Sequence, residues 1–330
     1  DRRLHQLLPD VALTYVLALK IDGVAVALRY ENGSLVEGST RGNGTVGDDI
    51  TANLRTVRSI PLQLNCADRA APAVLEVRGE VFMTRGGFAA LNTRRAEAGL
   101  EPFANARNAA AGSLKQLDPR VAAERPLAVV LYGLGEAEGV HFDKHTGLLA
   151  ALRDFGLPGP PDYRHCETLQ EIDAGLDRLA ERRHDYPFEM DGGVIKVNER
   201  NLYERLGTTA KSPRWAVAYK YEPEQAETRL KDIKVQVGRT GVLTPVAELE
   251  PVTVAGSTIQ HATLHNADEI ARKDIRIGDS VVIEKAGEVI PAVVRTLPEK
   301  RTGGEEQFTM PRNCPDCGGE VTRREGEVAY

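Results

Sequence analysis

The sequence predicts an α+β domain of antiparallel sheets with flanking helices, followed by an all-β barrel and a short cysteine-containing segment. Apolar strands alternate with amphipathic helices through the first two thirds of the chain. From Lys231 to Leu297 short β-branched runs broken by Gly and Pro replace them, without a convincing long helix. A Cys-x-x-Cys pair lies near the end. We therefore expect domains at residues 1–222, 223–305 and 306–330.

Length and composition describe a globular protein of more than one domain. The chain has 330 residues, more than one ordinary core holds, and is 42% hydrophobic and 27% charged. No run is long enough to span a membrane, and we expect a cytoplasmic monomer. The net charge of −6 excludes a protein coated in positive charge but permits local basic patches. The first residue is Asp1 rather than Met, as in a processed or excised piece.

The stretch from Leu17 to Gly23 carries the first candidate for chemistry. Apolar flanks at 15–19 and 24–30 predict two strands, with Lys20 at the end of the first. Gly23 permits a tight turn between them. A lysine there can act as a nucleophile when it is desolvated or crowded by other cations, although an isolated Lys-x-Asp-Gly is more often an ordinary strand end.

A hairpin and a glycine-rich loop come next. Asn32-Gly33 predicts a type I′ turn, because both residues tolerate positive φ. The second strand leads to Arg41, in a loop whose glycines allow the backbone to approach a phosphate. We expect Asp48 to cap a helix. Its apolar face would consist of Ile50, Leu54 and Val57.

The strand predicted at 73–83 alternates apolar and charged residues. Its polar face carries Glu76, Arg78 and Glu80, which fits either solvent or the floor of a nucleotide site. Thr84 is expected to cap the helix that follows.

The segment from Phe103 to Lys115 is rich in small residues and carries two cations. Arg107 and Lys115 are eight residues apart, about two helical turns, so both could lie along one phosphate track. A buried strand is expected at 127–134, and amphipathic helices at 144–156 and 168–184. The inward residues of the last helix would be Leu169, Ile172, Leu176 and Leu179.

Two later strands are predicted at 192–197 and 215–221, and we expect them to place Lys196 and Lys220 in the same cleft. The stretch from Arg200 to Lys220 has five basic residues against one acid, which fits a solvated face about as well as DNA.

Five stretches, in this order and spacing, resemble the nucleotidyltransferase motifs of bacterial NAD-dependent DNA ligases. The segment at 103–115 and the barrel stretches at 237–241, 262–266 and 286–291 resemble the same family. The resemblance therefore covers essentially the whole chain. The five motifs are Lys20-Ile21-Asp22-Gly23, Thr40-Arg41-Gly42-Asn43-Gly44, Leu75-Glu76-Val77-Arg78-Gly79-Glu80, Asp191-Gly192-Gly193-Val194-Ile195-Lys196-Val197 and Trp215-Ala216-Val217-Ala218-Tyr219-Lys220.

The resemblance implies an ATP-grasp-like nucleotidyltransferase (adenylation) domain, an OB-fold barrel and a partial zinc finger. It implies a ligase of DNA replication and repair that seals nicks in duplex DNA. Lys20 would attack the α-phosphorus of NAD and keep AMP on its nitrogen. AMP would pass to the 5′-phosphate of the nick, and the 3′-hydroxyl would then displace it. Fixed cations and Mg²⁺ or Mn²⁺ would neutralise the phosphoryl charge.

The resemblance also assigns roles to particular residues. The catalytic residues would be Lys20, Asp22, Lys196 and Lys220. Those that bind the nucleotide would be Lys20, Gly23, Arg41, Glu80, Lys196 and Lys220. The DNA contacts would be Arg107, Lys115 and Arg183 at the nick, and Arg239, Thr240, Lys285, Val289 and Ile290 on the barrel. Cys314 and Cys317 would bind Zn²⁺, in a site that is incomplete because zinc takes four ligands.

Two departures from the family pattern matter. Ala18 stands where the family usually has a Glu that helps hold adenine, and Lys115 stands where it usually has Arg. The family also grips the nicotinamide half of NAD with an N-terminal module, and we expect that this module and the segment joining it to the adenylation domain are absent here. We therefore expect slow or absent adenylation of this chain by NAD, and slow sealing of pre-adenylated nicks.

Two alternatives remain open. An ATP- or GTP-dependent RNA ligase or capping-type nucleotidyltransferase shares Lys-x-Asp-Gly, but not the segment at 103–115 or the half zinc knuckle. A catalytically impaired DNA-binding fragment would retain the barrel contacts without the chemistry. A covalent adduct formed from labelled NAD, ATP or GTP would separate these possibilities.

Overall fold

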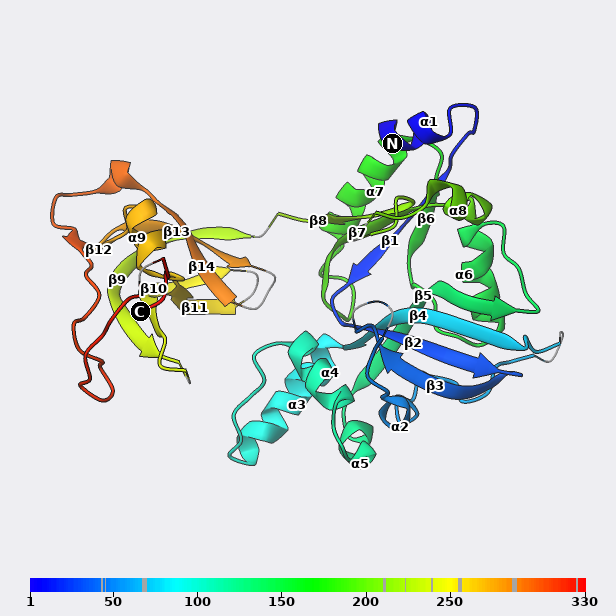
Figure 1. The fold of residues 1–330 in the computed structure, drawn as a ribbon, viewed down its shortest axis with the longest axis horizontal. Helices are drawn as coiled ribbons and strands as arrows, with labels where there is room; N and C mark the ends of the chain where they lie inside the picture. The colour runs from blue at the N-terminus through cyan, green and yellow to red at the C-terminus, as the bar shows by residue number, and fades with distance from the viewer. Residues whose placement is uncertain are drawn as a thin grey trace. The chain divides into compact units, whose positions relative to one another are not determined.

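The chain is α+β in its first part and an all-β barrel in its second, which confirms the predicted fold class (Figure 1). The computed structural model describes residues 1–42, 44, 46–66, 70–209, 212–222, 224–238, 240–254, 257–286, 290–324 and 326–330. Two compact units are present, Asp1–Tyr221 and Glu222–Tyr330. In the part of the chain described, none of the helices combines the length and apolarity needed to cross a membrane.

The first sheet of the first unit has the strand order β6-β1-β7-β8, and all its pairs are antiparallel. Helix α7 packs on it through Ile172, Leu176 and Leu179. The elements of this half are α1 (Arg2–Leu7), β1 (Tyr15–Ile21), β6 (Tyr163–Cys166), α7 (Leu169–Glu181), β7 (Met190–Val197), η1 (Arg200–Leu202), α8 (Tyr203–Leu206) and β8 (Ala216–Lys220).

The second sheet has the order β3-β2-β4-β5 and is also antiparallel. Asn32 and Gly33, with φ of 48° and 84°, form the predicted turn between β2 and β3. Helices α2, α4 and α6 pack against this sheet around its own core. The elements are β2 (Val24–Glu31), β3 (Ser34–Thr40), α2 (Thr51–Leu54), β4 (Val74–Met83), α3 (Arg85–Glu97), α4 (Ala106–Leu114), α5 (Pro119–Ala123), β5 (Leu127–Glu138) and α6 (His145–Asp154).

One of the two predicted helix caps is confirmed and the other is wrong. The Thr84 hydroxyl accepts a hydrogen bond from the Gly87 amide and caps α3. Asp48 does not cap α2, because its backbone pairs with Thr40 and lies outside the helix. Asp49 accepts the Thr51 amide instead, at 2.9 Å.

The inward face predicted for the helix at 168–184 is also wrong at one position. Leu169 is 45% exposed. It is the first residue of α7, and it precedes the turns that lie on the sheet.

The second unit is a closed barrel in which the strand order is β10-β11-β14-β13-β9. Its pairs are antiparallel except β11 with β14, which is parallel at Thr263 and Ala292. Asp279 is fully buried and accepts two hydrogen bonds from Arg301. The elements are β9 (Gln225–Val237), β10 (Leu243–Val254), β11 (Ser257–Thr263), α9 (Ala267–Arg272), β12 (Arg276–Ile277), β13 (Ser280–Ala286), β14 (Ile290–Thr296), η2 (Pro298–Lys300) and β15 (Glu306–Gln307).

Candidate active site

The chain passes from the first sheet to the second through only two residues, Asp22 and Gly23. The Asp22 amide donates to the carbonyl of Glu189 at 2.9 Å, which ties this link to the segment before β7. A Cβ atom at Gly23 would lie 2.4 Å from the carbonyl oxygen of Val81 and 2.8 Å from Cγ of Glu80. Only glycine therefore fits here, and the two sheets meet beside the end of β1.

Three lysines share one face of the first sheet. Gly192 on β7 is paired with Lys20 on β1 and with Lys220 on β8, and Lys196 lies four residues further along β7. Directly paired residues point to the same face of a sheet, and so do residues an even number apart in a strand. Ala18, two residues before Lys20, is buried on this face as well.

A single carboxylate contacts two of these lysines. Asp191 Oδ1 lies 2.6 Å from Nζ of Lys20, and its Oδ2 lies 3.4 Å from Nζ of Lys220. The Lys20 and Asp191 side chains are 20% and 19% exposed, whereas Lys220 is 65% exposed. Asp191 is the first residue of the motif at 191–197, but the sequence alone does not indicate that its carboxylate contacts these lysines.

Two further carboxylates lie beside the link between the sheets. Asp22 Oδ1 accepts a hydrogen bond from Nη1 of Arg107 at 2.7 Å, and this contact raises the pKa of Arg107. Burial raises the pKa of Glu80, while a hydrogen bond from the Tyr132 hydroxyl at 2.9 Å and the charges of Arg107 and Lys20 act in the opposite direction. Arg107, which was predicted to contact DNA, is thus brought to the carboxylate of Asp22.

Lys196 occupies a different environment from Lys20. Its side chain is buried, and Nζ donates to the Tyr132 carbonyl at 2.9 Å and lies 3.4 Å from Nε2 of His145. Burial, with the nearby charge of Arg200, lowers the pKa of Lys196 to about 7. Burial, with the charges of Lys196 and Arg200, lowers the pKa of His145 to about 2, so this imidazole is neutral. Within the described residues, no carboxylate forms an ion pair with Lys196.

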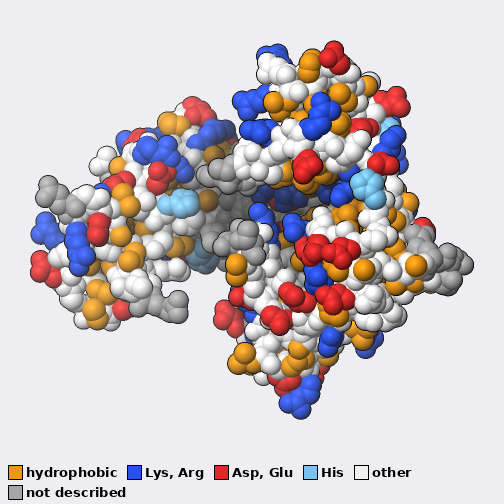
Figure 2. All heavy atoms as spheres, turned by 45° about the vertical axis from the view of Figure 1, so that its right-hand side comes forward, with side chains coloured by type: hydrophobic (Ala, Val, Ile, Leu, Met, Phe, Trp, Pro, Cys, Tyr) orange, Lys and Arg blue, Asp and Glu red, His pale blue; other side chains and the backbone are white. Residues whose placement is uncertain are grey.

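Of the other cations predicted in the first unit, Arg41 and Lys115 are exposed and Arg183 is half-buried. Arg41 follows β3, donates its amide to the Ala25 carbonyl, and lies near enough to Tyr132 for its charge to act on that phenol. Lys115 is 61% exposed and lies 2.9 Å from the carboxylate of Asp48. Arg183 donates Nε to the His184 ring. Figure 2 shows Lys and Arg side chains gathered in the hollow between the two halves of the first unit.

The residues predicted on the barrel are only partly described. Arg239 and Val289 lie outside the described residues. Thr240 is exposed at the turn before β10. Lys285 belongs to β13 and Ile290 to β14, two strands that are paired at this end of the barrel.

Cys314 and Cys317 lie in a tight turn, where the Gly318 amide donates to the Cys314 carbonyl at 2.9 Å. The backbone amides of Cys317 and Asp316 lower the pKa of the Cys314 thiol, which favours the thiolate that zinc binds. These residues fit half of a zinc site. No cluster of three or more potential His, Cys, Asp or Glu ligands occurs among the residues that the structure describes.

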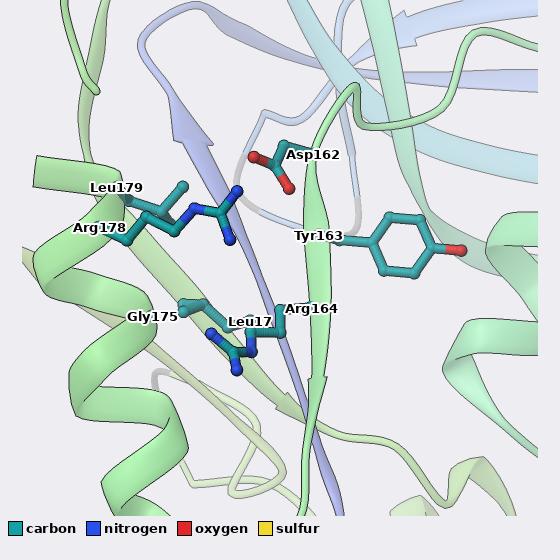
Figure 3. A pocket seen from close by; sticks show the side chains of 7 residues that line it. All are labelled: Leu17, Asp162, Tyr163, Arg164, Gly175, Arg178 and Leu179. Atoms are coloured by element: carbon teal, nitrogen blue, oxygen red, sulfur yellow. The ribbon is translucent and has the colours of Figure 1, made fainter. Parts of the chain in front are cut away.

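A small surface pocket of about 170 Å³ lies between β1, β6 and α7 (Figure 3). Arg164 and Arg178 reach toward the same space from β6 and α7. Leu17, at its floor, is three residues from Lys20 and therefore faces the opposite side of the sheet. The pocket thus does not contribute to the lysine face.

Comparisons with known proteins agree in one assignment. The family model for the NAD-dependent DNA ligase adenylation domain matches residues 1–224, and that for the NAD-dependent DNA ligase OB-fold domain matches residues 227–305. A protein named DNA ligase from Desulforudis audaxviator is 55% identical over 99% of this chain and 48% of its own length. The DNA ligase of Halalkalibacterium halodurans is 54% identical over 100% of the chain and 48% of its own.

The chain thus spans about half the length of these relatives. The two family models cover nearly all of the first 305 residues, and the identity extends through both units. The chain therefore belongs to the NAD-dependent DNA ligase family.

Proposed function

We propose that this chain carries out the nucleotidyl transfers of an NAD-dependent DNA ligase that seals nicks in duplex DNA during replication and repair. The observation that supports this most directly is the position of the Lys20 amine. It lies at the junction of the two sheets, in contact with Asp191, on the sheet face that also carries Lys196 and Lys220. Family membership supplies the reaction class, and this arrangement supplies the groups that the reaction needs.

In the first transfer, Nζ of Lys20 attacks the α-phosphorus of NAD. A P–N bond forms, the P–O bond to nicotinamide mononucleotide breaks, and that electron pair leaves with the nucleotide. The attacking nitrogen must lose a proton, and the oxygen of Asp191 at 2.6 Å is positioned to accept it. AMP then passes to the 5′-phosphate of the nick, and the 3′-hydroxyl attacks and releases it.

Each step places negative charge on phosphoryl oxygens, which fixed cations stabilise. Lys196, Lys220 and Arg41 are the groups we assign to this charge, with Gly23 giving the nucleotide access to the backbone. Asp22 and Glu80 are adjacent carboxylates of the kind that hold Mg²⁺ or Mn²⁺ together with substrate phosphates. The metal, when bound, would neutralise charge on the phosphoryl group.

For DNA we propose two sets of contacts. Arg107, which contacts Asp22, Lys115, which contacts Asp48, and Arg183 are the cations that we assign to the phosphate at the nick. The residues on the barrel, Arg239, Thr240, Lys285, Val289 and Ile290, would contact the duplex. We propose domain limits of 1–222, 223–305 and 306–330, with Zn²⁺ held through Cys314 and Cys317.

Intact-mass measurement with different nucleotides tests the proposal. The chain is incubated with Mg²⁺ and, separately, with NAD, ATP and GTP for hours. We expect a slow gain of one AMP from NAD alone. In a second assay, we expect sealing of a nick that is already adenylated, because that step needs only AMP, DNA and the cations. GMP on the protein, or AMP from ATP but not from NAD, would contradict the assignment. No adduct and no sealing, with duplex DNA still bound, would indicate a DNA-binding fragment without activity.

A substitution on the barrel tests the DNA contacts. Arg239→Ala should weaken binding to nicked duplex and reduce the slope of log affinity against log salt by about one, because one phosphate contact is lost. Formation of lysyl-AMP should be unaffected, because Arg239 is not among the residues that we assign to the nucleotide. An unchanged salt slope would rule out the contact.

A further inference from the structure

Arg85, the first residue of helix α3, directs its polar groups at one distant segment of the chain. Its guanidinium donates to both carboxylate oxygens of Glu189, at 2.9 and 3.2 Å. It also donates to the carbonyls of His184 and Arg183, at 3.0 and 3.3 Å. The backbone amide of Arg85 donates to the carbonyl of Pro187 at 2.7 Å. Five hydrogen bonds therefore join the start of α3 to the segment between α7 and β7.

The segment that α3 contacts, residues 183–189, adjoins two parts of the candidate site. Arg183, one of the cations assigned to the nick, is its first residue, and Asp191 follows its end by two residues. The carbonyl of Glu189 accepts the Asp22 amide at 2.9 Å. Glu189 thus contacts α3 through its side chain and the link between the two sheets through its main chain.

Apolar packing holds the later part of this segment but not its start. Phe188 is buried, and its ring lies 4.9 Å from the ring of Phe82 on β4. Arg183 is half-buried and His184 is exposed, so their backbone depends on hydrogen bonds. Arg85 supplies hydrogen bonds to the carbonyls of both residues.

The ion pair between Arg85 and Glu189 contributes geometry rather than much stability. The two side chains are 31% and 35% exposed, and ion pairs with this degree of exposure stabilise a fold little. A guanidinium that donates to both oxygens of a carboxylate, however, fixes the distance and the orientation of the two groups. The contact therefore fixes the 183–189 segment in place more than it stabilises the whole fold.

We propose that Arg85 is a positioning residue for Arg183. Nε of Arg183 donates to the ring of His184 at 3.1 Å, and Arg85 holds the carbonyls of both residues. The Arg183 guanidinium is thus ordered before DNA binds, which reduces the entropy lost on binding. This inference rests on the proposed function for the identity of the DNA phosphate, but the hydrogen bonds from Arg85 stand independently of it.

A double-mutant cycle tests whether Arg85 acts through Arg183. Affinity for nicked duplex DNA is measured for the wild type, Arg85→Ala, Arg183→Ala and the double variant. Arg183→Ala should weaken binding about tenfold, through the loss of one charged hydrogen bond. Arg85→Ala should weaken it about fivefold, and the double variant should bind no more weakly than Arg183→Ala, because the effects of residues that share one contact are not additive.

Two further variants separate positioning from charge. Arg85→Lys keeps the positive charge but not the planar fork, so it should lose about as much affinity as Arg85→Ala. Arg120 is the matched control, since it is 89% exposed and pairs with Asp118, and Arg120→Ala should bind DNA like the wild type. The variants at position 85 should fold, because they keep the Thr84 cap and introduce good helix formers.

Amide hydrogen exchange and kinetics give two further readouts. The Asp22 amide, which the Glu189 carbonyl accepts, should exchange about tenfold faster in Arg85→Ala, because the 183–189 segment opens more often. Exchange at the centre of β1 should be unchanged, since that strand is paired on both sides. In sealing of pre-adenylated nicked DNA, Arg85→Ala should raise KM about fivefold and leave kcat unchanged, as the loss of a binding contact does.

The outcomes distinguish this inference from the proposed function. Additive losses in the cycle, or an Arg183→Ala variant that binds DNA like the wild type, would overturn the inference even if the wild type seals nicks. A wild type that neither forms lysyl-AMP nor seals would overturn the proposed function, while a non-additive cycle would still support the inference. A loss of unfolding stability in Arg85→Ala with unchanged DNA affinity and KM would show that Arg85 is only structural.

Discussion

Lys20 and Lys196 lie on adjacent strands and on the same face of one sheet, yet their surroundings are opposite. Lys20 is partly exposed and contacts a carboxylate, which Lys220 also contacts. Lys196 is buried and contacts a carbonyl and an imidazole. A paired amine presents little net charge until the pair opens, whereas the buried amine of Lys196, whose pKa is lowered to about 7, presents an uncompensated charge only while it is protonated. Under the proposed function, the first arrangement belongs to the nucleophile and the second to a lysine that binds the nucleotide.

The two lysine environments should contribute differently to the stability of the fold. A partly exposed ion pair contributes about 0–1 kcal/mol to stability. Burial that lowers the pKa of a lysine from 10.5 to about 7 costs on the order of 5 kcal/mol when the amine stays protonated. The protein therefore carries most of the electrostatic strain of the site at Lys196, and the predictions below test this division from the largest expected effect to the smallest.

Lys20→Ala should abolish covalent AMP on the protein. Its amine is the proposed nucleophile, and no hydroxyl or thiol stands beside it in the sequence. Intact-mass measurement after incubation with NAD and Mg²⁺ gives the answer, with Lys231→Ala on the barrel as a control that should retain the adduct. An adduct of the same mass on the Lys20 variant would place the nucleophile elsewhere.

Asp191→Asn should slow lysyl-AMP formation by about 100-fold, which corresponds to the loss of a charge-assisted hydrogen bond and of the proton acceptor. The asparagine side chain has nearly the same shape as aspartate, so the fold should be retained. Single-turnover formation of the adduct is the measurement, with Asp162→Asn on the opposite face of the sheet as the control. Equal rates for the two variants would remove Asp191 from the mechanism.

Lys196→Met should change how stability depends on pH. Because the folded pKa of Lys196 lies below its unfolded value, the unfolded state binds more protons between about pH 7 and 10.5, and the wild type gains stability as pH rises. Relative to the variant, the gain should be about 2 kcal/mol from pH 7 to 9. Urea unfolding at pH 7, 8 and 9 measures it. A constant difference between the two proteins would show that Lys196 is not desolvated.

Tyr132→Phe should have the smallest effect. The variant keeps the carbonyl that accepts Lys196 but loses the hydroxyl that donates to Glu80, a contribution of about 1 kcal/mol. AMP affinity should fall about fivefold, while the titration midpoint of Lys196 stays unchanged. Calorimetry measures the affinity for AMP, and an NMR titration of ¹³C-labelled lysine side chains measures the midpoint of Lys196. A shifted titration midpoint of Lys196 would mean that the surroundings of Glu80 and of Lys196 are coupled through the Tyr132 side chain.

Local signals in the sequence predicted the fold well. The Asn32-Gly33 turn and the Thr84 cap depend on neighbouring residues alone, and both are present. The prediction of an Asp48 cap failed because Thr40, at the end of strand β3, holds the backbone of Asp48 outside the helix. The prediction that Leu169 is buried failed, because helical periodicity does not indicate which turn of the helix first contacts the sheet.

For the candidate site, the sequence supplied residues mainly through its resemblance to a ligase family. Lys20, Lys196 and Lys220 stand in three of its motifs, and the strand register brings them to one face of the sheet. His145 was missed because it enters from a helix 51 residues earlier than Lys196, and nothing in its own neighbourhood indicates the contact. Tyr132 was missed because its contribution to Lys196 is a main-chain carbonyl, which any residue would provide.

That main-chain acceptor has a consequence for inhibition. Point mutations replace side chains and leave carbonyl groups in place, so every variant at position 132 still presents the oxygen that Lys196 contacts. The same holds for the carbonyl of Glu189, which accepts the Asp22 amide. A small molecule anchored to the Tyr132 oxygen would meet an unchanged anchor in any resistant strain. Resistance would have to arise through the shape of the surrounding side chains, and under the proposed function that shape must still admit AMP.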